Sequence, residues 1–231
     1  MSEAIKSNHH NLQVLFEDNH LIIVNKRVGD IVQADKTQDM PLSEVVKQYI
    51  KIKYNKPGEV FLGVVHRLDR PTSGIVVFAR TSKALTRLNQ MFKEHQLQKV
   101  YWALVKQKPE PDSQILEHYL VRNPKNNTSR AYQKEVPNSK KARLRYTVLK
   151  NLKNYHLIEI ELFTGRHHQI RSQLSYIGSP IKGDLKYGDK RSNPNGGINL
   201  HARTLEFVHP VSKETIKITA PLPQENTWDK I

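Results

Sequence analysis

Short apolar or alternating runs follow one another along the chain, separated by polar clusters rich in turn-forming residues. Runs of this length, with many β-branched residues, are typical of β-strands. The runs at 61–65 and 75–79 contain almost no polar residue, which predicts strands buried on both faces. The expected strands are 12–16, 21–24, 61–65, 75–79, 100–105, 144–149, 156–163, 200–207 and 215–220.

Three other stretches place their apolar residues on one side of a helix. Thr81 or Ser82 precedes the second stretch and is a suitable N-cap. Gly178 follows the third stretch and suits a helix C-terminus. The expected helices are 42–50, 84–92 and 167–177.

Strands and helices mix without a regular strand–helix–strand alternation, which argues for an α+β fold rather than a doubly wound parallel sheet. The chain shows no internal repeat, no Gly/Ser linker and no break in composition, so residues 12–231 are expected to form one domain. Residues 1–11 are polar and lack the apolar core of a secretory signal, and we expect them to be a disordered lead. The strongly basic stretch 122–145 contains several turn signals and is expected to be a surface loop that contributes charge.

The charge balance indicates a polyanionic partner. The chain has 231 residues, of which 37% are hydrophobic, and it carries 37 Lys and Arg against 22 Asp and Glu. The resulting net charge of +15 predicts attraction to nucleic acid first and to an anionic membrane second. No apolar run is long enough to span a bilayer, and the absence of cysteine fits a cytoplasmic protein without disulfides.

The corner between the strands 61–65 and 75–79 concentrates charge beside buried backbone. It reads His66-Arg67-Leu68-Asp69-Arg70-Pro71-Thr72-Ser73-Gly74. Placing an ionised carboxylate beside buried backbone costs free energy unless a cation pairs with it or it takes part in a reaction. Asp69 is therefore either a residue that caps a surface turn or a carboxylate nucleophile held by an arginine.

This corner, 66–74, closely resembles the active-site motif of the RluA-type pseudouridine synthases. Four further segments resemble motifs of that family in the same order along the chain, and the similarity covers almost everything after the first dozen residues. The further segments are 17–26, 99–105, 164–171 and the closing pair 180–184 and 200–202. Arg27 stands where the family usually has proline.

The resemblance implies one catalytic domain with a curved, mixed and mostly antiparallel sheet, flanking helices and a central active-site cleft. It leaves no room in this chain for the small N-terminal RNA-binding domain of many family members. It also implies conversion of uridine in RNA to pseudouridine, a rearrangement that gains and loses no atoms and so requires no cofactor or metal. Asp69 would be the catalytic carboxylate, either attacking the ribose or abstracting a ribose proton.

The resemblance also assigns four residues to RNA. Arg171 would be the cation beside Asp69, because a guanidinium stays charged and can hold both carboxylate oxygens. Arg67 would fill the gap left by a flipped-out uridine, and Tyr101 would face the flipped base. Arg166 is a weaker candidate for a phosphate or structural contact. Trp102, on the other side of the same strand as Tyr101, is expected in the core.

Metal binding is not favoured by the histidines. Adjacent residues on a helix point in different directions, and His167, His168 and His201 lack acidic partners at ligand spacing. His66 is expected to be a structural hydrogen-bonding group rather than a general base.

Two functions remain open from the sequence. The first is an RNA pseudouridine synthase acting on ribosomal or transfer RNA. The segment 183–197 is more similar to family members that act on transfer RNA, which favours that target. The second is an RNA-binding module of the same fold that has lost catalysis. We expect a monomer without an obligatory protein partner.

Overall fold

A computed structural model describes residues 5–35, 37–224 and 227–231. The chain divides into two compact units, one from the described residues up to Leu97 with Ala202–Pro223, the other from Gln98–His201 with the described end of the chain. Both units combine strands with helices, so the expected α+β class is confirmed. None of the helices in the described part of the chain combines the length and the hydrophobicity of a membrane span.

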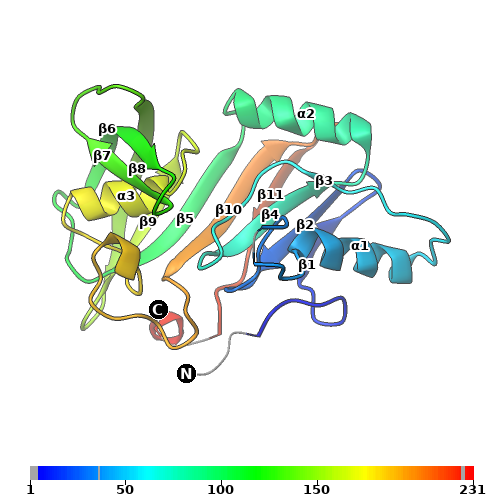
Figure 1. Ribbon diagram of the computed structural model, residues 1–231, viewed down its shortest axis with the longest axis horizontal. Helices are drawn as coiled ribbons and strands as arrows, with labels where there is room; N and C mark the ends of the chain where they lie inside the picture. The colour runs from blue at the N-terminus through cyan, green and yellow to red at the C-terminus, as the bar shows by residue number, and fades with distance from the viewer. Residues whose placement is uncertain (1–4, 36, 225–226) are drawn as a thin grey trace. The chain divides into compact units, whose positions relative to one another are not determined.

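The first unit is a sheet in the strand order β1-β2-β4-β10, with β3 beside β4 and β11 beside β10. The strand β2 is buried along its whole length, and it runs antiparallel to both β1 and β4 (Figure 1). Thr81 caps the second helix as expected, because its side-chain oxygen accepts a hydrogen bond from Ala84 N at 3.2 Å. The elements are β1 (Val14–Glu17), β2 (Leu21–Lys26), α1 (Leu42–Lys53), β3 (Gly63–Val64), β4 (Ser73–Ala79), α2 (Ser82–Lys93), β10 (Leu200–Val208) and β11 (Thr215–Thr219).

The expected strand 61–65 is only partly correct. Pairing with β4 is restricted to Gly63 and Val64, and Phe61 is exposed. The next backbone donor of β4, Val77 N, donates instead to His66 Nε2 at 2.9 Å. An imidazole thus takes the place of a backbone carbonyl, and the chain is free to turn into the corner. The expectation that His66 is a structural hydrogen-bonding group is confirmed.

The second unit is an antiparallel sheet in the order β5-β9-β8-β6-β7. Its core lies on one side of these strands and includes Leu144, Ile158 and Ile160, together with Ile170 and Leu174 of the third helix. That helix ends where expected, since Gly178 has a positive φ of 79°. The elements are β5 (Gln98–Val105), β6 (Ser113–Asn123), β7 (Thr128–Tyr132), β8 (Lys140–Asn151), β9 (His156–Leu162), α3 (Gln169–Tyr176), and the short 3-10 helices η1 (Leu185–Tyr187) and η2 (Trp228–Lys230).

The expectation of a surface loop over 122–145 is wrong, because β7 and parts of β6 and β8 occupy this stretch. In β8, Ala142 and Leu144 are buried while Arg143 and Arg145 are exposed. This alternation is typical of a strand with one face in the core and the other in solvent. Because the solvent-facing positions are charged, the stretch contains no continuous apolar run that would have indicated a strand.

The described part of the expected N-terminal lead makes specific contacts. Ser7 donates two hydrogen bonds to the Asp30 carboxylate, from its backbone N at 2.9 Å and from its hydroxyl at 2.6 Å. Lys6 forms an ion pair with Asp39 at 2.7 Å. Residues 1–4 lie outside the described part of the chain.

Candidate active site

The corner that carries Asp69 is closed by its own backbone. Thr72 N donates a hydrogen bond to the Asp69 carbonyl oxygen at 3.0 Å, which completes a turn. Leu68 is buried beneath this turn, Asp69 is half-buried, and Arg67 is exposed. Burial of the Leu68 side chain therefore anchors the turn, while the charged residues on either side of it, Arg67 and Asp69, lie closer to solvent.

A buried lysine ties this corner to β2. Lys26 is only 1% exposed, and its Nζ donates to the carbonyl oxygens of Arg27, Arg70 and Thr72 at 3.0, 3.2 and 2.7 Å. Burial lowers the pKa of Lys26 from 10.5 to about 8, although the negative charges of Asp30 and Asp69 oppose the shift. The ammonium group thus holds the backbone on the C-terminal side of Asp69 in one place. Lys26 was not predicted as a site residue. The sequence signal that could have identified it is a lysine placed shortly after the apolar run 21–24.

The glycine that ends the corner is required by close packing. Gly74 has a φ of 113°, and a Cβ atom built on it would lie 2.4 Å from the Ala202 carbonyl oxygen. Only glycine accepts both this backbone conformation and this close approach.

In the second unit, Arg171 lies on α3 and is held in a fixed orientation. Its Nε and Nη2 donate to the two carboxylate oxygens of Asp184 at 2.7 and 2.8 Å. Both side chains are buried, and the guanidinium carbon lies 4.9 Å from the centre of the Tyr187 ring. A bidentate pair resting on an aromatic face leaves the guanidinium little freedom to rotate.

Tyr187 is itself fixed by hydrogen bonds at its hydroxyl. The hydroxyl accepts from Ser129 N at 2.7 Å and lies 2.9 Å from His168 Nδ1. His168 precedes α3 in a left-handed conformation, and its ring stacks on that of His167. The two histidines therefore serve this network. The described residues contain no group of three or more His, Cys, Asp or Glu placed to hold a metal.

Tyr101 and Trp102 lie on opposite faces of β5. Tyr101 is half-buried and packs against the core of the second unit. Trp102 is also half-buried, but its Nε1 donates to the Glu159 carboxylate at 3.1 Å on the face away from that core. The prediction that Trp102 is a core residue is therefore only partly correct: on its face of β5 the fully buried position is Leu104, and Trp102 itself is half-buried.

Arg166 has a structural contact. Its Nε donates to the Lys141 carbonyl oxygen at 3.0 Å, and its backbone N donates to the Gln169 side chain at 3.0 Å. These bonds tie the turn before α3 to the start of β8.

The structure thus places Asp69 and Arg67 in the first unit and Tyr101, Arg166 and Arg171 in the second. The pairing of Asp69 with Arg171 stays a prediction. Sequence reasoning missed the carboxylate that orients Arg171. The only signal for it was that Asp184 ends the motif segment 180–184.

Comparisons with known proteins agree on one family. A family model described as RNA pseudouridylate synthase matches residues 20–176. The chain is 34% identical over 215 residues to the ribosomal large subunit pseudouridine synthase C of Vibrio cholerae, which covers 90% of this chain and 65% of that protein. It is 33% identical over 224 residues to the ribosomal large subunit pseudouridine synthase D of Zymomonas mobilis, covering 93% of this chain and 70% of that protein. The chain therefore spans about two thirds of the length of these curated relatives.

A solved structure has the same fold. The human RNA pseudouridylate synthase domain containing 1 superimposes with a TM-score of 0.76 at 25% identity. The match covers 95% of this chain and 86% of the human chain.

Proposed function

Because this chain belongs to the RNA pseudouridylate synthase family, we propose that it converts uridine in RNA to pseudouridine. In this reaction the C1′–N1 glycosidic bond breaks, the uracil turns, and C5 bonds to C1′. C5 loses a proton and N1 gains one, so the product has the same atoms as the substrate. The supporting observation is that the family match at residues 20–176 includes Asp69, Tyr101 and Arg171.

Asp69 is the proposed catalytic residue, acting as a nucleophile or a base at the ribose. The Lys26 ammonium and the turn closed by Thr72 support this role, because they fix the backbone that carries the carboxylate. A carboxylate on rigid backbone is already positioned for reaction, so less conformational entropy is lost on the way to the transition state.

Arg171 is the proposed cation for the reacting centre. The contacts with Asp184 and Tyr187 support this role, because they hold a buried guanidinium in one orientation. Arg67, exposed beside Asp69, is proposed to fill the space of the flipped nucleotide. Tyr101 is proposed to stack on the flipped base, and Arg166 to contact the RNA backbone.

The proposed substrate is ribosomal RNA of the large subunit. Both curated relatives are named ribosomal large subunit pseudouridine synthases, which favours this target over transfer RNA. We further propose that residues 12–231 act as one catalytic domain in the cytoplasm, as a monomer without an obligatory protein partner.

The test is a map of pseudouridine in large-subunit RNA from cells with and without the gene. The proposal predicts that one or more pseudouridines disappear with the gene, return with the wild-type gene and fail to return with Asp69→Asn. An unchanged map would contradict the proposed substrate. Return of the modification with Asp69→Asn would contradict the role of Asp69.

A catalytically inactive RNA-binding module is not favoured. The corner 66–74, Tyr101 and Arg171 are all retained, and Arg171 keeps a bidentate partner. The same map separates the two functions, because an inactive module would leave no pseudouridine that depends on the gene.

A further inference from the structure

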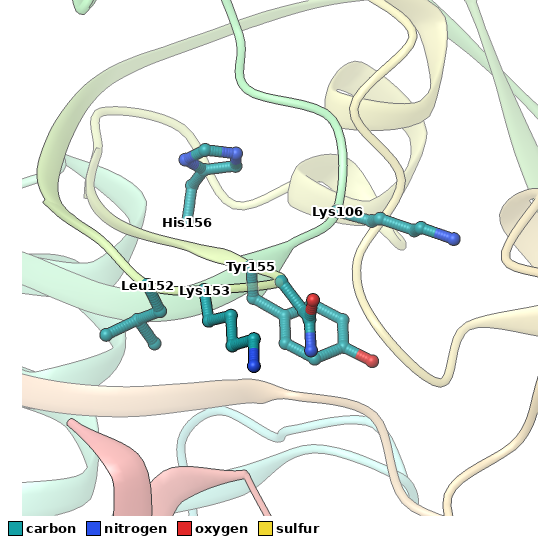
Figure 2. Close-up of a pocket in the computed structure, with 6 residues that line it drawn as sticks. Lys106, Leu152, Lys153, Tyr155 and His156 are labelled. Atoms are coloured by element: carbon teal, nitrogen blue, oxygen red, sulfur yellow. The ribbon is translucent and has the colours of Figure 1, made fainter.

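A basic pocket of about 360 Å³ lies at one end of the sheet in the second unit. It is formed by the turn between β8 and β9 and by Lys106, the residue that follows β5. In the view of Figure 2 the Tyr155 ring lies between the side chains of Lys153 and Lys106. The residues that line it are Lys106, Leu152, Lys153, Asn154, Tyr155 and His156.

The backbone of this pocket is held in place. Leu152 N donates to the Tyr155 carbonyl oxygen at 2.8 Å, which closes the turn. His156 is directly paired with Val105, so the turn and the end of β5 are in a fixed register. The pocket is therefore built on paired strands rather than on a long loop.

The side chains combine positive charge with an aromatic face. Lys106 and Lys153 are exposed, Tyr155 is half-buried, and none of the six lining residues is acidic. A third ammonium, that of Lys182, lies 5.5 Å from the centre of the Tyr155 ring. Exposed lysines on a turn are often only solvated. Here the two exposed lysines line a pocket together with a partly accessible aromatic ring, and the half-buried Lys182, which also donates to Asn193, adds a third positive charge beside that ring. This combination matches a nucleotide, which offers a flat base and an anionic phosphate.

The pocket is also connected to the segment that orients Arg171. Lys182 N donates to the Leu104 carbonyl oxygen at 2.8 Å, and Ile181 forms a bridge with Val105. Asp184, the partner of Arg171, follows two residues after Lys182. One short segment, 181–184, thus contributes a cation to the Tyr155 ring and a carboxylate to Arg171.

We propose that this pocket binds one unpaired nucleotide of the RNA substrate, outside the nucleotide that is modified. The base stacks on Tyr155, and Lys106 and Lys153 neutralise the adjacent phosphates. This inference rests on the proposed function only in taking RNA as the ligand. It adds a point of attachment whose lining includes none of the residues proposed for the reacting uridine.

The first test measures the Kd for a large-subunit ribosomal RNA fragment that the protein modifies or, failing modification, for single-stranded oligouridylate. Tyr155→Leu is expected to raise the Kd by roughly 5-fold to 100-fold, because loss of one aromatic stack has an effect of this size. Tyr155→Phe keeps the ring and is expected to leave the Kd unchanged. Because binding is measured directly, the result is independent of whether the protein isomerises uridine.

A charge-matched pair of variants tests the phosphate contacts. Lys106→Ala with Lys153→Ala should weaken binding more than Lys51→Ala with Lys83→Ala, which removes the same charge from exposed positions of α1 and α2. Equal losses in both double variants, or an unchanged Kd with Tyr155→Leu, would overturn the proposal.

Cross-linking of the wild-type protein tests the same contact without any substitution, so its result does not depend on whether a variant folds. RNA carrying 5-iodouridine is irradiated on the protein, and the tryptic peptide that begins at Asn154 is analysed by mass spectrometry. The proposal predicts an adduct on Tyr155. Adducts confined to other peptides would overturn it.

Discussion

Two buried cations, Lys26 and Arg171, are held by oxygen atoms in different ways. Lys26 donates to three backbone carbonyl oxygens, whereas Arg171 donates to both oxygens of one carboxylate. A compact ammonium suits convergent carbonyl groups, and a planar guanidinium suits a carboxylate. Each choice of residue type therefore follows from the geometry of its acceptors.

Replacement of Arg171 by lysine is predicted to lower the free energy of unfolding by about 1–3 kcal/mol. Lysine keeps the charge but lacks the planar fork that forms two parallel hydrogen bonds to Asp184, so the well-aligned bidentate contact is lost. Urea denaturation measures this change. Arg166→Lys is the control, because Arg166 makes one Nε contact to a backbone carbonyl, and its effect should be smaller. Equal effects of the two substitutions would contradict the bidentate role.

Lys26 is predicted to make stability depend on pH. The pKa of this group is about 8 in the folded protein, against 10.5 for an ordinary lysine. Between these values the unfolded chain binds more protons, so the free energy of unfolding rises as the pH is raised. Lys26→Met removes the titrating group. Urea denaturation from pH 7 to pH 10 should therefore show a wild-type stability that increases relative to Lys26→Met, and a constant difference would contradict the assignment.

At the scale of elements, the sequence pattern predicts strands well where apolar residues dominate and poorly where they do not. The buried strands β2 and β4 and the three helices lie where the pattern places them. The strand β7 was missed because Arg130 and two small residues, Ser129 and Ala131, make its alternation hard to see. The early end of β3 depends on the His66 side chain, which no periodicity detects.

Gly74→Ala is predicted to destabilise the protein by about 2 kcal/mol or more, since the left-handed backbone alone costs about 1–3 kcal/mol. The added Cβ would also lie 2.4 Å from a backbone oxygen. Gly178→Ala is a matched control. Gly178 has a φ of 79°, but nothing lies within 4 Å of its would-be Cβ. Thermal unfolding should show a clearly larger loss for Gly74→Ala, and equal losses would show that the close contact with Ala202 has no effect.

At the scale of the whole molecule, the net charge of +15 and the family motifs were informative from the sequence alone. They predicted RNA as the partner and Asp69 and Arg171 as site residues. The roles of Lys26 and Asp184 could not be predicted in this way, because each depends on a contact between two separate elements that only the folded chain brings together. Lys26 contacts Thr72, and Asp184 reaches back to α3.

RNA binding is predicted to weaken steeply with salt. Each phosphate that the protein neutralises contributes about −0.7 to −0.9 to the slope of log K against log salt concentration. A surface as basic as this one should neutralise several phosphates, so we expect a slope steeper than about −3. Titrations of ribosomal RNA fragments at several salt concentrations measure it. A flat response would contradict the prediction that the excess positive charge contacts RNA.

The central claim, that the Asp69 carboxylate performs the isomerisation, is tested most directly with RNA labelled with tritium at C5 of uridine. Formation of the C5–C1′ bond displaces that hydrogen, so tritium released to water counts turnovers. The wild-type protein should release tritium from large-subunit ribosomal RNA. Asp69→Asn should bind the same RNA with an unchanged Kd and release no more tritium than a protein-free control. Release by Asp69→Asn at the wild-type rate would contradict the claim.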